Sequence, residues 1–165
     1  MDGREPVTRS ANLPGLKPAT LFAVVTDFPA YPRLFPEIKA VRVLSRTPAG
    51  AGGGEIVRVE FKAQVVLAVR YVLDLVCRLE SAEPVAAFTV DWTYVEGEIV
   101  TESQGGWRFV SQGDGTMMSY RASLSVRAPL PGFMLRKVTD GLVAASLPAM
   151  FKAIEGEARG RPIAG

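Results

Sequence analysis

The sequence predicts an α+β protein in which one antiparallel sheet of six to seven strands packs against a long C-terminal helix. Two observations lead to this prediction. Apolar and polar residues alternate through much of residues 38–126, which is the period of half-buried strands. Residues 131–158 instead repeat apolar residues at helical spacing. Such a sheet has one apolar face, and the terminal helix is the only expected element long enough to cover it.

The first 36 residues are expected to hold one strand and two short helices. Residues 1–6 should form a disordered tail, and residues 7–13 a short edge strand. Pro18 is well placed to open a helix that ends near Asp27, because proline is tolerated in a first turn. Three prolines then fall within eight residues, which leaves room only for a short second helix over residues 31–35.

The middle of the chain reads as consecutive antiparallel strands. The Gly-rich loop over residues 47–54 contains no Gly-Lys-Ser/Thr and leads into a strand, so we interpret it as a hairpin connection rather than a phosphate-binding loop. Residues 96–104 have no clear pattern, and the Asp-Gly pair in the turn over residues 112–115 indicates a hairpin. The expected strands are residues 38–46, 56–62, 66–79, 85–95, 105–109 and 118–126.

The helix expected over residues 131–158 carries two apolar stripes that are out of phase. One runs through Leu135, Val138 and Leu142, and the other through Leu147, Met150, Phe151 and Ile154. Pro148 removes a backbone hydrogen bond, so we expect a kink within residues 144–148. Continued straight, the first stripe meets Ala145, Ser146, Ala149 and Ala153. These small side chains either allow close packing or leave space along the wall of a cavity.

The inward positions of the strands are rich in large aromatic residues. Buried tyrosine and tryptophan need partners for their polar ends, so several of them together either find backbone acceptors or line a cavity that holds water or ligand. The cavity hypothesis takes its candidate residues from the inward strand positions and from the terminal helix. The candidates are Phe61, Val69, Tyr71, Leu73, Phe88, Trp92, Trp107, Tyr120, Leu142, Ser146 and Met150.

Composition excludes several kinds of chemistry. The chain has no histidine, so it cannot build a Ser-His-Asp or Cys-His mechanism or an H-E-x-x-H zinc site. Its single cysteine, Cys77, lies in an apolar strand and is expected to be a buried free thiol. The acidic group Asp91, Glu96, Glu98 and Glu102 is spread over a strand and a turn, so we interpret it as a solvated rim. We therefore expect no metal and no cofactor.

Charge and terminal features suggest a compartment. The 19 basic and 17 acidic residues are interspersed, and no basic cluster indicates nucleic-acid binding. The charged N-terminus does not read as a signal peptide, and no uncharged stretch reaches about 18 apolar residues. We expect a cytoplasmic protein that is one domain over residues 1–165.

Two motifs resemble a known family. The segment LFAVVTDFPAYPRLFP at residues 21–36 resembles the opening of the polyketide cyclase/dehydrase and coenzyme Q-binding branch of the START-like (SRPBCC, helix-grip) superfamily. The segment from Gly113 to Tyr120 and the terminal helix are similar to the last strand and helix of that branch. The resemblance implies a curved antiparallel sheet wrapped around the long helix, with an apolar cavity for lipids, quinones or polyketides. It also implies that Asp27 and Tyr31 have capping and packing roles.

The leading functional hypothesis is the binding or transport of a mid-sized hydrophobic molecule such as a lipid, a quinone or a polyketide-like compound. The loops over residues 47–54 and 129–134 would gate the cavity, and the second places apolar residues beside Arg136 and Lys137, where they could touch a membrane transiently. The alternative is an enzyme, a polyketide aromatase/cyclase. It would use Tyr71, Tyr94 or Tyr120 on a poly-β-keto chain.

The positions of the arginines favour binding over catalysis. A catalytic tyrosine would need help from a nearby cation, because its ordinary pKa is about 10. Arg70, Arg108 and Arg121 all fall on the outward positions of their strands. A third hypothesis, a protein-interaction role with an incidental cavity, stays open, and so does the oligomeric state.

Overall fold

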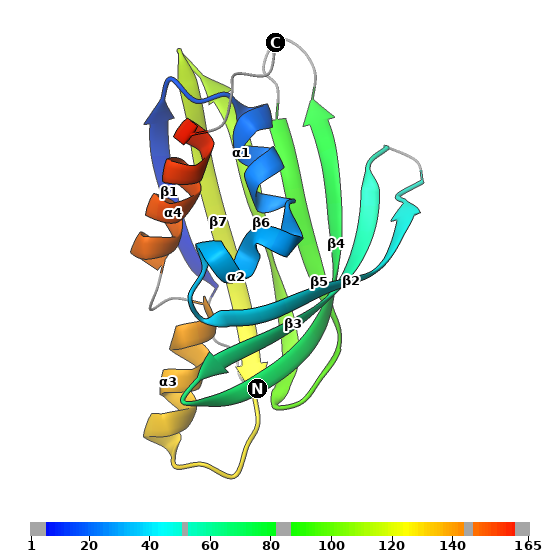
Figure 1. Ribbon diagram of the computed structural model, residues 1–165, viewed down its shortest axis with the longest axis vertical. Coiled ribbons are helices and arrows are strands. Elements are labelled where there is room, and N and C mark those ends of the chain that lie inside the picture. Colours follow the sequence, from blue (N-terminus) through cyan, green and yellow to red (C-terminus); the bar gives the residue numbers. More distant parts are fainter. Residues whose placement is uncertain (1–5, 51–52, 82–86, 144–146, 161–165) are drawn as a thin grey trace.

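The computed structural model describes residues 6–50, 53–81, 87–143 and 147–160. In this part of the chain, seven strands form one antiparallel sheet in the order β1-β7-β6-β5-β4-β3-β2, which confirms the predicted α+β helix-grip fold. The sheet is strongly curved, and β2 and β3 cross at a steep angle to β6 and β7 (Figure 1). The strands are β1 (Val7–Pro14), β2 (Ile38–Pro48), β3 (Glu55–Val65), β4 (Leu67–Ser81), β5 (Ala87–Gly97), β6 (Val100–Gln112) and β7 (Gly115–Val126).

The two predicted helices lie between β1 and β2, and a short 3-10 helix that was not predicted lies between them. They are α1 (Pro18–Val25), η1 (Phe28–Ala30) and α2 (Tyr31–Leu34). Pro18 occupies the first turn of α1, where its missing N–H costs no hydrogen bond. The chain ends with α3 (Gly132–Val143) and α4 (Leu147–Gly160). Among the described helices, none is both long enough and apolar enough to cross a membrane.

The segment from Asp27 to Phe35 turns the chain from α1 into the sheet. Phe28 is fully buried, and the Tyr31 hydroxyl donates a hydrogen bond to the carbonyl oxygen of Val25 at the end of α1. The ring of Tyr31 meets the ring of Phe35 edge-on at 4.9 Å. Asp27 is the N-cap residue of η1, but its side chain makes no capping hydrogen bond. The expected packing role therefore holds for Tyr31, and the expected capping role of Asp27 does not.

The C-terminal segment contains two helices where the sequence predicts one helix over residues 131–158. Residues 144–146, where the expected kink begins, lie outside the described residues. Pro148 occupies the first turn of α4, a position that tolerates the loss of an N–H. Both apolar stripes are present, since Val138 of α3 and Leu147, Phe151 and Ile154 of α4 are buried.

The apolar face of the sheet is covered by several helices, which corrects the expectation that the terminal helix covers it alone. Helix α1 lies over β5 and β6, where the ring of Phe22 meets the ring of Phe88 at 4.8 Å. Helix α3 contacts β3 and β7, and α4 packs against α1 and α2.

Several predicted boundaries shift in the structure. Strand β6 begins at Val100, inside the stretch over residues 96–104 that showed no pattern, directly after Ile99 at a φ of 74°. Val66 does not begin β4; it is the single residue between β3 and β4 and has a φ of 65°. The final hairpin is present, and Gly113 takes the positive φ of 60° that its turn requires. Of the expected N-terminal tail, only Pro6 lies within the described residues.

Candidate functional site

A cavity of about 110 Å³ lies on the inner face of the sheet. Its wall is almost entirely aromatic or aliphatic, and strands β3 to β7 supply most of it. The aromatic members are Tyr31, Phe35, Phe61, Tyr71, Trp92, Trp107 and Tyr120. The aliphatic members are Ile38, Ala63, Leu73, Leu75, Ala122, Leu124, Leu142 and Met150, and the two polar members are Glu37 and Ser103.

The alternation of the strands brings these residues to one face. Phe61 and Tyr71 are cross-strand neighbours on β3 and β4, and their rings stack at 5.3 Å. Trp107 and Tyr120 are paired in the same way on β6 and β7, with ring centroids 4.7 Å apart. Offset and tilted aromatic pairs of this kind stabilise a fold by about 0.5–1.5 kcal/mol beyond the area they bury. The pairs therefore help to hold the wall of the cavity together.

Trp92 packs against a glycine, whose lack of a side chain makes room for the indole ring. Its cross-strand partner on β6 is Gly105, and the indole ring lies over this glycine. A Cβ atom on Gly105 would lie 2.6 Å from a ring carbon of Trp92 and 2.3 Å from the carbonyl oxygen of Arg121. Only glycine therefore lets the indole lie against the strand and lets β7 approach β6 this closely.

The structure places eight of the eleven candidate residues in the wall of the cavity. These are Phe61, Tyr71, Leu73, Trp92, Trp107, Tyr120, Leu142 and Met150. Val69 is buried in the core and Phe88 packs against Phe22, so neither lines the cavity. Ser146 lies outside the described residues. Ala149, on the stripe of small residues, is exposed, because α4 is a separate helix whose inward face begins at Leu147.

Several residues of the wall were not among the candidates. Ala63, Leu75, Ala122 and Leu124 share the inward parity of residues that were predicted, so the alternation of their strands was a sufficient signal. Ser103 lies in the stretch that showed no pattern. Phe35, Glu37 and Ile38 come from the end of the α2 segment and the start of β2, and no period in the sequence places them at the cavity.

The polar groups of the wall fall into two classes. The hydroxyl group of Tyr31 is already bonded to Val25. Those of Tyr71, Tyr120 and Ser103 have no hydrogen-bond partner within the described ranges, and the same is true of the indole N–H groups of Trp92 and Trp107. None of these five groups is sealed away without a partner, since the one such atom among the described side chains is Nε of Arg78. All five residues line the cavity.

Burial sets the protonation of the phenols. It raises the pKa of Tyr71, Tyr120 and Tyr31 far above the ordinary value of 10, chiefly because a phenolate would lose its hydration in the wall. The three phenols are therefore neutral and can donate hydrogen bonds, but they cannot act as bases near neutral pH. Glu37 is the one charged side chain among the described residues of the wall.

Arg70 and Arg121 pair with carboxylates outside the wall of the cavity. Arg70 holds Glu60 at 2.7 Å, and this hydrogen bond lowers the pKa of the Glu60 carboxyl. Arg121 pairs with Asp91 at 3.2 Å. These contacts agree with the outward parity read from the sequence, and they leave no arginine in the described wall of the cavity. The described residues also hold no cluster of three acidic or cysteine side chains that could bind a metal ion.

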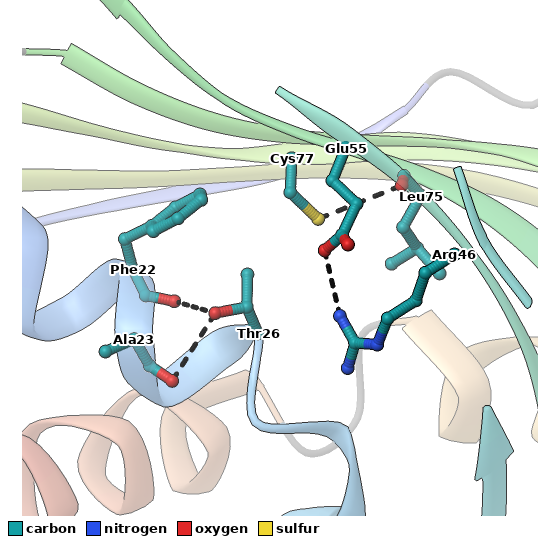
Figure 2. A network of polar contacts seen from close by, with 7 residues as sticks. All are labelled: Phe22, Ala23, Thr26, Arg46, Glu55, Leu75 and Cys77. Atoms are coloured by element: carbon teal, nitrogen blue, oxygen red, sulfur yellow. Dashed lines mark hydrogen bonds and ion pairs between the residues drawn. The ribbon is translucent and has the colours of Figure 1, made fainter. Parts of the chain in front are cut away.

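Cys77 on β4 is buried next to Glu55 of β3, and Glu55 pairs with Arg46 at 2.9 Å (Figure 2). Burial, reinforced by the Glu55 carboxylate, raises the pKa of the Cys77 thiol to about 12. In the unfolded chain the thiol should titrate near its ordinary pKa of about 8.5. The thiol therefore favours the folded state below about pH 8.5, and this contribution is lost as the pH rises toward 12.

We expect the native protein to react with an aromatic disulfide reagent about a thousandfold more slowly than the unfolded chain at pH 7, because only the thiolate reacts. The absorbance of the released thiol, recorded with and without guanidinium chloride, measures both rates. The chain has one cysteine, so no other thiol contributes to the signal. Equal rates in the two conditions would contradict the burial of Cys77.

Comparisons with known proteins were made by sequence and by structure. The family model described as polyketide cyclase/dehydrase and lipid transport matches residues 15–151. No curated protein is similar enough in sequence to this chain to count as a match.

Solved structures share the fold at low sequence identity. The aromatase/cyclase Zhui from Streptomyces sp. R1128 has a TM-score of 0.67 and 20% identity, over 94% of this chain and 93% of that chain. A STAR-related lipid transfer protein from Xanthomonas axonopodis has a TM-score of 0.70 and 16% identity, over 96% of this chain and 89% of that chain. A START superfamily protein from Mycobacterium smegmatis has a TM-score of 0.66 and 20% identity, over 93% of this chain and 97% of that chain.

Proposed function

Because this chain belongs to the polyketide cyclase/dehydrase and lipid transport family, we propose that it binds and carries a mid-sized hydrophobic molecule in the cavity between its sheet and its C-terminal helices. The observation that supports this most is the composition of the wall. Fifteen apolar or aromatic residues surround the cavity, with Glu37 and Ser103 as the remaining described members. Few polar groups in an apolar wall are typical of sites that hold a ligand by burial and orient it by a few hydrogen bonds.

The size of the cavity limits what it can hold without rearrangement. A dry cavity of about 150 Å³ admits benzene, so about 110 Å³ suits an occupant of about one ring. A lipid or quinone therefore requires the wall to move. Leu142 and Met150 line the cavity from two separate helices, α3 and α4, and both side chains are only half-buried. We propose that the wall opens on this side, where both side chains are only half-buried.

The second candidate is a polyketide cyclase, and the free phenols favour it. Tyr71 and Tyr120 could each donate a hydrogen bond to a carbonyl oxygen and so polarise a poly-β-keto chain. Their raised pKa excludes them as bases near neutral pH, however, and Glu37 is the one carboxylate in the described wall. These observations favour a carrier.

A transient contact with a membrane is part of the carrier proposal. Phe133 is 63% exposed at the start of α3, close in sequence to the exposed cations Arg136 and Lys137. An exposed aromatic residue beside cations suits the interface of an anionic bilayer. Leu130 instead packs against the core. The proposal that loops 47–54 and 129–134 gate the cavity stays a prediction, and residues 51–52 lie outside the described residues.

Native mass spectrometry of the protein, purified without added ligand, tests the proposal. We expect a fraction of the protein to carry a co-purifying hydrophobic molecule, and the variant Trp92→Ala to lose most of it, because the indole forms part of the wall. An empty protein that takes up no molecule from a lipid and quinone extract would contradict the carrier proposal. Turnover of a poly-β-keto thioester by that empty protein, lost on Tyr120→Phe, would establish the cyclase instead.

A further inference from the structure

The donors in the cavity have no acceptors within the protein. The indole N–H groups of Trp92 and Trp107 can only donate, and neither has an acceptor among the described residues. The hydroxyl groups of Tyr71, Tyr120 and Ser103 are also unpaired there. Trp107, Tyr120 and Ser103 are each more than nine-tenths buried. Solvent can reach these five donors, so a ligand that displaces the water from them leaves them unsatisfied unless it supplies acceptor atoms.

The charges of the wall restrict what that ligand can be. No lysine or arginine is among its described residues, and the single charged group, Glu37, is an acid. A carboxylate or phosphate would lose its hydration here without gaining a cation, and Glu37 would repel it. A bound cation could face Glu37 and the aromatic rings, but it would leave five donors without acceptors.

We infer that the ligand is an electrically neutral molecule that carries carbonyl or ether oxygen atoms on an apolar skeleton, and that the cavity rejects both carboxylates and ammonium ions of the same skeleton. This inference rests on the proposed function, since it concerns the molecule held in the same cavity. It selects among hydrophobic ligands, favouring ketones, quinones and esters over free fatty acids and phospholipid headgroups.

Four one-ring probes of matched shape test the inference. Acetophenone carries a carbonyl oxygen, ethylbenzene carries no acceptor, benzoate carries a negative charge and benzylammonium a positive one. Both tryptophans of the chain line the cavity, so the two indole N–H signals in an NMR titration report binding directly. We expect acetophenone to bind about five- to tenfold more tightly than ethylbenzene, the gain of about one hydrogen bond. Benzoate and benzylammonium should bind at least tenfold more weakly than acetophenone.

A double variant with a matched control tests which hydrogen-bond donors favour acetophenone over ethylbenzene. In the double variant Tyr71→Phe and Tyr120→Phe, the advantage of acetophenone over ethylbenzene should shrink at least twofold, while ethylbenzene still binds and so reports an intact cavity. The control is Tyr94→Phe, whose hydroxyl donates to the carbonyl oxygen of Val100 at 2.7 Å and which lies outside the described wall. It should keep the full advantage.

The possible outcomes separate the two proposals. Equal binding of acetophenone and ethylbenzene by the unmodified protein would overturn the inference about the ligand and leave the cavity as a binding site. The same holds if benzoate or benzylammonium binds as tightly as acetophenone, or if the double variant keeps the whole advantage. Failure of all four probes to bind would overturn the proposed function and this inference with it.

Discussion

Replacement of Gly105 by alanine is expected to destabilise the protein by about 3 kcal/mol, near the upper end of the usual cost of overpacking. The new Cβ atom would lie 2.3 Å from the carbonyl oxygen of Arg121 and 2.8 Å from the Cα atom of Ala122. Both are backbone atoms of β7, so the strands β6 and β7 must separate to relieve the contact. The ring of Trp92, at 2.6 Å, must move as well.

The control is the same substitution at Gly156 in α4, where a Cβ atom would meet nothing within 4 Å. Alanine favours a helix over glycine by about 1 kcal/mol, so Gly156→Ala should stabilise the protein slightly. Urea denaturation followed by tryptophan fluorescence measures both changes in the free energy of unfolding. A Gly105→Ala variant as stable as the unmodified protein would show that β6 and β7 do not approach this closely.

Replacement of Leu142 by arginine is expected to weaken the binding of acetophenone at least about a hundredfold. Leu142 lines the cavity, and an arginine side chain is longer than the leucine that it replaces. Inside a cavity of about 110 Å³ the new side chain would fill the space that the probe needs. A buried guanidinium without hydration is costly unless it is paired, and in the described wall only Glu37 could pair with it. In either arrangement the cavity is blocked.

The matched control is Leu44→Arg, because Leu44 on β2 is 40% exposed and does not line the cavity. This variant should bind acetophenone as the unmodified protein does. The indole N–H signals give both affinities, and urea denaturation checks that the two variants are folded. A folded Leu142→Arg variant that still binds acetophenone with unchanged affinity would place the binding site elsewhere.

Much of the wall could be predicted because strand alternation is a local property. The inward parity of β4 places Tyr71 and Leu73 in the cavity, and that parity can be read from neighbouring residues alone. The start of α1 could be predicted as well, because Pro18 restricts the backbone only within its own turn. The inward face of α4 also followed from its spacing.

The rest of the site could not be predicted, because it depends on contacts between segments that lie far apart in the sequence. Phe88 points to the same side of β5 as the residues of the wall, but Phe22 of α1 covers it. No local pattern in the sequence shows which helix lies over which strand. Glu37 reaches the cavity from a loop, where no period predicts direction. The contact of Trp92 with Gly105 depends on the register between β5 and β6, which the sequence alone did not specify.

The central claim is that an apolar hollow exists between the sheet and the C-terminal helices, and diffraction from crystals pressurised with xenon tests it most directly. Xenon enters dry apolar cavities of this size without needing hydrogen bonds. The account predicts a xenon peak bordered by Phe61, Leu73, Trp107 and Leu142. Continuous side-chain density through this space, with no xenon peak at any pressure that the crystals tolerate, would contradict it.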